Sequence, residues 1–403
     1  MSSRPVKSFV FLTVTLSVLA SAAILPVLAP LIRSLQLSPS EGGWMLSIGS
    51  LLMAISAPSW GSAADRFGRG RVMLFGFGGM FLAYVVFVLT VQCGLATCVT
   101  GVGVLASVSA ARALLGAFLP SIPAAAQALM ADHTSDDERS AGMALIGAAN
   151  GAGLVLGPAL GGLASLGGLL WPLFLACALS FVATVYVAAK APPPIPSAAS
   201  AREGDPGTRM NWHVGRWLLA STLTWFAIVS VQIAVGFYFQ ERLRLTNAQA
   251  AQQIAIALTL VGASLFASQV LQARWLRWQP KRLLAFGAAL WIVGTLVLLF
   301  TANAPAYFLA YALLGAGAGF LLPGALAGAS LAVAADRQGS VAGLSAATQG
   351  IAFVIGPVVS TWLYEQDASA PLWCLVVTML VLVVLAVAPA RLAPGMRGST
   401  GQT

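Results

Sequence analysis

The stretch GSAADRFGRGRV, from Gly61 to Val72, decides how this chain is organised. It places Asp65, Arg66, Arg69 and Arg71 within seven positions, although only 8% of the residues are charged. Long apolar runs lie on both sides of it. A charged turn between two such runs indicates a short polar loop that joins two membrane-spanning segments.

The composition supports an integral membrane protein. Of 403 residues, 59% are hydrophobic, and the mean hydropathy is +0.88. A soluble domain carries roughly a quarter charged residues, so this chain has too few polar groups to cover a water-exposed surface. Lipid offers no partner to a free backbone amide, so the spans are expected to be helices. A β-barrel would need alternating polarity, which the sequence lacks.

The apolar runs predict twelve spans, since a bilayer core takes about 20 apolar residues per helix. The first run is expected to be a retained helix, because it continues too far for a cleaved signal peptide. The spans are expected near residues 9–31, 44–63, 72–92, 102–131, 140–165, 169–190, 215–240, 248–272, 282–302, 305–333, 340–363 and 369–389.

The basic residues predict the orientation. With a cytoplasmic N-terminus, 17 of the 21 Lys and Arg residues lie on the inner side, Arg112 lies within a span, and only Arg33, Arg242 and Arg244 lie outside. This asymmetry follows the positive-inside rule. It predicts a bacterial-type inner (plasma) membrane protein with both termini in the cytoplasm. The net charge of +9 is therefore explained by basic residues in the cytoplasmic loops, and it does not indicate a nucleic-acid partner.

The chain divides into two halves that resemble each other. Residues 191–213 are rich in Pro, Ser and charge, which predicts a cytoplasmic linker between six-helix bundles at 1–190 and 214–403. ALLGA occurs at 113–117 and 312–316, Gly-Pro at 157–158 and 356–357, and LQLSPSEGG (35–43) resembles LRLTNAQAA (243–251). Parallel repeats of a six-helix unit are typical of transporters, with the substrate site between the halves near mid-bilayer.

Asp65 is an acid in a basic loop. It is expected to pair with Arg66 or Arg69, or to cap a helix N-terminus. Such a contact is a conformational latch if it forms in one state and breaks in another; the alternative is that the acid is incidental. The stretch resembles the signature loop of the major facilitator superfamily, with matches at Gly61, Ala64, Asp65, Arg66, Gly68 and Arg69. Ala63 and Gly70 depart from that pattern. The resemblance implies that Asp65 bridges the halves in the outward-open state, near Gly339 and Ser340.

Arg112 is the only basic residue placed well inside a span. A buried base normally faces a cavity or a partner; the alternative is an arginine that snorkels from a misplaced helix end. Arg112 and Gly116 resemble the R-x-x-x-G motif of the superfamily's fourth helix. In proton-coupled members that arginine is implicated in proton transfer.

The stretch GAGLVLGPALGG, residues 151–162, has glycine at every fourth position, which leaves one helix face open to close packing. Pro158 adds a kink or pivot. The stretch resembles the fifth-helix antiporter motif of twelve-helix drug:proton antiporters, with Ala144 in place of the first glycine. The matching residues are Gly153, Gly157, Pro158, Gly161 and Gly162.

The polar groups that are candidates for a central cavity are few, and no Asp or Glu lies deep within a span. A cavity with one arginine and no acid favours neutral or anionic solutes over cationic drugs. Glu41, Asp65 and Arg112 are candidates for a proton relay. The candidate cavity residues are Arg112, Gln127, Asn150, Trp225, Gln232, Tyr238, Gln252, Tyr311 and Gln349.

The sequence thus predicts an all-α secondary transporter that works by alternating access. The expected activity is proton-coupled efflux of a small neutral or anionic compound. The alternative is an importer or exporter of a specific anionic metabolite, such as a siderophore or an organic acid. No phosphate loop, H-E-x-x-H or G-x-S-x-G motif occurs, so neither ATP use nor an enzyme is expected. We expect a monomer in the lipid bilayer, whose partners are its substrate and protons, with no cofactor and no metal. Cys93 and Cys98, in one outer loop, form either a disulfide or two free thiols.

Overall fold

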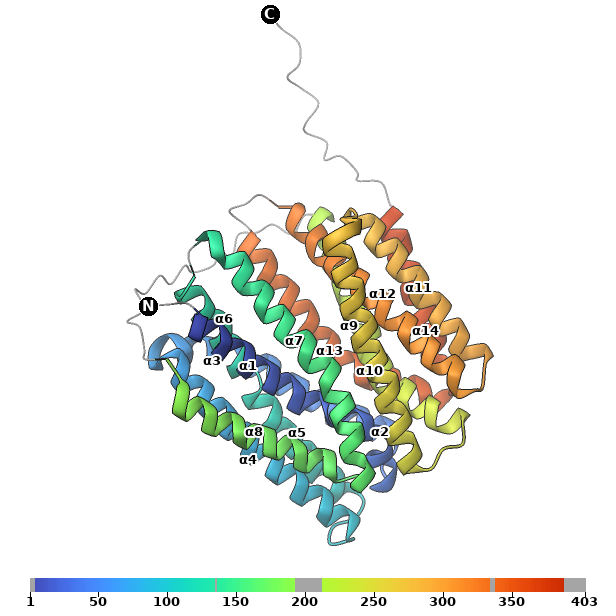
Figure 1. Ribbon diagram of the computed structural model, residues 1–403. Coiled ribbons are helices and arrows are strands. Elements are labelled where there is room, and N and C mark those ends of the chain that lie inside the picture. The colour runs from blue at the N-terminus through green and yellow to red at the C-terminus, as the bar shows by residue number, and fades with distance from the viewer. Residues whose placement is uncertain (1–3, 135, 193–211, 334–337, 388–403) are drawn as a thin grey trace, which may run out of the picture.

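The computed structural model describes residues 4–134, 136–192, 212–333 and 338–387, and these residues form an array of long helices (Figure 1). The first half contains α1 (Arg4–Ala22), α2 (Leu25–Ser34), α3 (Pro39–Phe67), α4 (Arg69–Leu95), α5 (Val102–Phe118), α6 (Ser121–Asp132), α7 (Asp136–Ala164), the short turn η1 (Ser165–Gly167) and α8 (Trp171–Lys190). The second half contains α9 (Trp212–Arg242), α10 (Asn247–Leu271), the short turn η2 (Gln272–Leu276), α11 (Pro280–Phe300), α12 (Ala304–Leu331), α13 (Gln338–Gln366) and α14 (Ala370–Val387).

These helices make twelve membrane-spanning segments in two six-helix bundles, as predicted. Eleven segments are long and apolar enough to span a membrane by composition alone. The twelfth, α3, has 29 residues, but its serines and glycines lower its hydropathy. Two predicted spans are interrupted: the first breaks between α1 and α2, and the fourth breaks at Pro120 between α5 and α6. Residues 193–211 of the expected linker lie outside the described residues.

The two halves are built alike. Helices α4 and α8 form one flank of the molecule, and α11 and α14 form the opposite flank (Figure 1). Helix α7 packs against α1 of its own half and α10 of the other half, and α13 packs in the same way against α9 and α3. Each half therefore contributes one helix of this kind to the interface between the bundles.

The repeat that the sequence indicates near residues 35 and 243 has the same local structure in both places. Ser38 caps α3 and Thr246 caps α10, each in a reciprocal capping box with the side chain three residues later. Two residues before each cap, Gln36 and Arg244 have φ angles of 57° and 52°. The repeats are therefore equivalent at an offset of 208 residues.

The ALLGA repeat has a structural reason as well, because its glycine is a helix-crossing point in both halves. A Cβ on Gly116 of α5 would collide with the carbonyl oxygen of Gly49 on α3. A Cβ on Gly315 of α12 would collide with the carbonyl oxygen of Val261 on α10. Small residues permit such close helix contacts in membranes.

These crossings predict a large difference between two glycine substitutions. Gly116→Ala is expected to lower the unfolding free energy by about 1–3 kcal/mol, because the backbone of α3 must move to admit the methyl group. Gly147→Ala on α7 is the matched control, since a Cβ there meets nothing within 4 Å. Thermal unfolding of the purified proteins in detergent measures both, and equal melting temperatures would contradict the assignment.

Candidate functional site

The signature loop is a tight connection between α3 and α4. Helix α3 ends at Phe67 and α4 begins at Arg69, so Gly68 alone joins them. Gly68 has a φ of 92°, a conformation that favours glycine. Gly61, one turn and a half before the end of α3, has open space at its Cβ position.

Asp65 forms an ion pair with Arg69, one of the two partners expected for it. The Nε of Arg69 also lies 3.2 Å from the Oδ2 of Asp132, at the end of α6. Arg66 instead lies over the ring of Phe67, 5.3 Å from its centroid. The network therefore joins three helices of the first half, and Asp132 is a member that was not expected from the sequence. Gly339 and Ser340 belong to α13, but their side chains lie outside the described residues, so the bridge to them stays a prediction.

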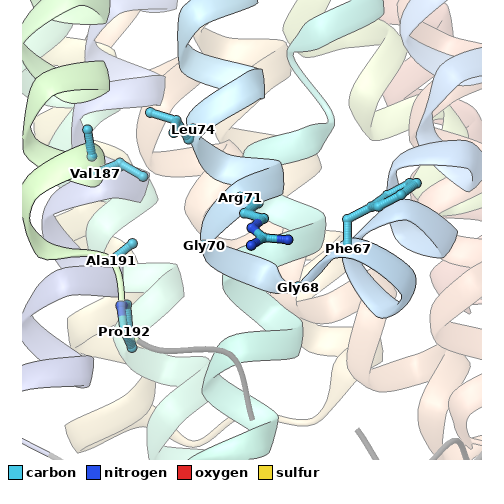
Figure 2. A pocket seen from close by; sticks show the side chains of 9 residues that line it. Phe67, Gly68, Gly70, Arg71, Leu74, Val187, Ala191 and Pro192 are labelled. Carbon is cyan, nitrogen blue, oxygen red and sulfur yellow. The ribbon is translucent and has the colours of Figure 1, made fainter. Parts of the chain in front are cut away.

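A small hollow of about 200 Å³ lies beside this loop, between α4 and α8. Figure 2 shows its lining, in which Leu74 of α4 points toward Val187 of α8. Arg71 of α4 and the residues just after α8, Ala191 and Pro192, complete this lining. The volume is below the ~300–1,000 Å³ of ordinary ligand pockets. The hollow also lies within one half, so it is not the substrate site expected between the halves.

Arg112 lies on α5, where it is partly buried and directed toward α4. Its Cζ lies 5.9 Å from the ring centroid of Phe87, and the hydroxyl of Tyr84 is close enough to interact with it electrostatically. Its buried Nε has no hydrogen-bond partner among the described residues. Arg112 is therefore a true intramembrane base and not an arginine at a helix end.

The antiporter-motif glycines bring α7 against two other helices. A Cβ on Gly153 would contact Val18 of α1, and a Cβ on Gly157 would contact Ala22 at the end of α1. A Cβ on Gly161 would contact Ala23, the next residue after α1. Gly162 faces the other half, where a Cβ would meet Ala255 of α10. Pro158 is buried within α7. The motif therefore sits where the two bundles touch.

The other candidate cavity residues do not form one cluster in this conformation. Tyr238 and Tyr311 lie in the core of the second half, where Tyr238 stacks on Tyr307 and Tyr311 packs edge-on against Phe239. Their aromatic rings fill space between α9 and α12, so they do not line an open cavity here.

The remaining candidates are more accessible or bond locally. Trp225 packs against Phe353 of α13, with ring centroids 5.8 Å apart. Asn150 donates a hydrogen bond to the carbonyl of Ile146. Gln127 is exposed, whereas Gln232, Gln252 and Gln349 are half-buried. The structure thus places these residues on several helices without joining them into a ligand-binding set.

One end of the molecule carries polar contacts between the halves that were not predicted from the sequence. We call it the outer end, because its residues lie in the loops predicted to be extracytoplasmic. Arg33 of α2 contacts Glu241 of α9 and Tyr364 of α13. Glu365 of α13 accepts hydrogen bonds from the backbone and side chain of Ser40. The halves are therefore joined at the outer end.

Cys93, in the last turn of α4, and Cys98, just after that helix, also lie at the outer end. Both are free thiols in the structure. The two side chains interact with each other, so the choice between a disulfide and two free thiols stays a prediction.

Comparisons with known proteins agree with this architecture. The model of the Major Facilitator Superfamily matches residues 10–280 and 251–401. The class C tetracycline resistance protein of Escherichia coli is 27% identical over 376 residues, which cover 89% of each chain. Multidrug resistance protein 1 of Bacillus subtilis (strain 168) is 22% identical over 374 residues, 91% of each chain.

Among solved structures, a bacterial homologue of the human lysosomal transporter Spinster, in an inward-facing and occupied conformation, has the same fold. Its TM-score is 0.70 at 15% identity, over 96% of each chain. The matched segments of the family model cover nearly all of the chain, including the signature loop, Arg112 and the α7 glycines. The protein is therefore a multi-pass membrane transporter that belongs to the major facilitator superfamily.

Proposed function

We propose that the protein exports a small neutral or anionic organic compound in exchange for protons, by alternating access between two halves at 1–190 and 214–403. The observation that carries the proposal is the packing of α7. Its glycine face lies against α1, and Gly162 lies against Ala255 of the other half. A face without side chains lets helices shift against each other at low steric cost.

The relatives support the direction of transport. The resistance proteins of Escherichia coli and Bacillus subtilis match over about nine tenths of their lengths. Resistance to a drug is consistent with its removal from the cell. We also propose that the protein lies in a bacterial-type inner membrane with both termini in the cytoplasm, as the distribution of its basic residues predicts.

The substrate class follows from the charge within the membrane. Arg112 is a partly buried base whose Nε lacks a described hydrogen-bond partner, and an unpaired charge at this depth is costly. An anionic or polar neutral solute would provide the missing partner, whereas a cation would be repelled. The same observation also suits the second candidate, an importer or exporter of one anionic metabolite such as a siderophore or an organic acid.

Transport into inverted membrane vesicles tests the proposal. Tetracycline, a carboxylated dye and the cationic dye ethidium are the three probes, and vesicles without the protein are the control. We expect the first two to accumulate when a proton gradient is present, and a protonophore to abolish their uptake. Accumulation that survives the protonophore would reject proton exchange, and accumulation of ethidium alone would reject the substrate class. Accumulation only in right-side-out vesicles would favour an importer.

A further inference from the structure

The contacts between Arg33, Glu241 and Tyr364 connect three helices from both halves. An Nη2 of Arg33 lies 3.5 Å from Oε2 of Glu241 and 3.3 Å from the hydroxyl oxygen of Tyr364. The Tyr364 hydroxyl donates a hydrogen bond to the same Glu241 oxygen. The guanidinium also lies over the ring of Phe237, 5.7 Å from its centroid. Each of the three polar groups thus contacts both of the others.

Arg33 and Glu241 are equivalent positions of the two repeats. They are separated by 208 residues, the same offset that aligns the capping serine of α3 with the capping threonine of α10. Two equivalent residues that touch each other lie next to the symmetry axis that relates their units. The ion pair is therefore located where the pseudo-twofold axis leaves the outer end of the molecule.

The contacts beside this pair also join one half to the other. Asn247 at the start of α10 donates a hydrogen bond of 2.8 Å to the side chain of Ser34 on α2. A Cβ on Gly43 of α3 would collide with Thr361 of α13. Because Thr361 is fully buried, this seam excludes water at the level just inside the pair.

We infer that Arg33, Glu241 and Tyr364 form an outer gate, which holds the halves together at this end and separates each time the substrate site opens outward. The inference rests on the proposed alternating access. These residues are distinct from the signature loop, which lies at the opposite end of α3. The gate residues position the halves and are not expected to contact the transported solute.

The test measures how accessible the seam is in purified full-length protein in detergent. The reporter is Thr361→Cys in a chain whose four native cysteines are replaced by serine, and the probe is a water-soluble maleimide. Arg33→Gln and Glu241→Gln are each expected to speed labelling by about two- to fivefold, as suits a partly exposed ion pair. Tyr364→Phe, which removes only the hydroxyl, is expected to have a smaller effect in the same direction.

The charge swap Arg33→Glu with Glu241→Arg is the decisive variant. Because the two positions are equivalent, the swapped pair is expected to form again and to return labelling to within about twofold of the parent. Arg242→Gln is the matched control, because it removes an exposed arginine next to Glu241 and should leave labelling unchanged. Ser47→Cys repeats the measurement if Thr361→Cys lowers the melting temperature, because Ser47 is also buried and lies on α3, four residues after Gly43.

The outcomes separate the gate from the proposed function, because labelling needs neither a substrate nor a membrane. Unchanged labelling in both single variants would overturn the gate, and so would a swapped variant that is labelled faster than either single. The expected labelling pattern in a protein that moves no solute would leave the gate in place and reject the proposed function.

Discussion

Replacing Arg112 by alanine is expected to reduce transport by at least about 100-fold while the amount of protein in the membrane stays the same. An arginine near the centre of a membrane helix costs roughly 2.5–3.5 kcal/mol on insertion scales. Arg112 has a buried Nε without a described hydrogen-bond partner, and no acid but only the ring of Phe87 and the hydroxyl of Tyr84 are described as interacting with it. Few local contacts offset the free-energy cost of placing this charge in the membrane. We therefore expect Arg112 to gain a binding partner, the substrate or a proton-carrying group, during transport. Loss of about 3 kcal/mol of binding to that partner corresponds to about 100-fold.

The controls for Arg112 separate transport from folding. Alanine removes a costly charge, so the melting temperature of Arg112→Ala should be equal or higher. Arg112→Lys keeps the charge but not the planar guanidinium, and partial activity is expected. Arg274→Ala removes an exposed arginine in the turn η2, which follows α10 in the second half, and should transport normally. Full activity of Arg112→Ala in vesicles would rule out its role in substrate or proton binding.

The fold could be predicted from the sequence because it depends mainly on hydropathy and on loop charge, which can be read from each segment separately. Hydropathy places a helix wherever about 20 apolar residues occur, and the basic loops orient the helices. Even α3, whose serines lower its hydropathy, was predictable, because a charged loop follows it and the orientation requires a span there. The repeats were also informative, since Gly116 and Gly315 recur where helices must cross closely.

The contacts between distant segments could not be predicted in the same way. Asp132 meets Arg69 across 63 residues, and Tyr364 meets Arg33 across 331. Nothing local to these residues indicates the pairing. For Arg33 and Glu241 a signal did exist, because the offset of the repeats makes them equivalent. Tyr238 and Tyr311 were expected in a cavity because of their hydroxyl groups, but in this conformation their aromatic rings are buried in the core. Their role in a cavity stays a prediction.

Asp65→Asn is expected to lower transport by at least tenfold with little effect on stability. The Asp65 side chain is 68% exposed, and its partner Arg69 keeps its contact with Asp132 when Asp65 is neutralised. An exposed ion pair contributes about 0–1 kcal/mol, so the melting temperature should shift by only a few degrees. Asp65→Glu, which retains the charge, should retain part of the activity.

A large loss of transport with little loss of stability in Asp65→Asn would distinguish a conformational latch from an incidental acid. In the described conformation the halves are joined at the outer end, and the Asp65 ion pair lies within the first half. That pair is therefore too exposed, and too local, to explain a tenfold loss of transport. Such a loss would require a contact that Asp65 makes in another conformation, as expected of a latch between the halves. Asp132→Asn is the comparison, because it removes the other partner of Arg69 and leaves the acid of the loop in place. If Asp65→Asn transports at the parental rate in vesicles, or loses transport only in proportion to its stability, Asp65 is an incidental acid of a basic loop.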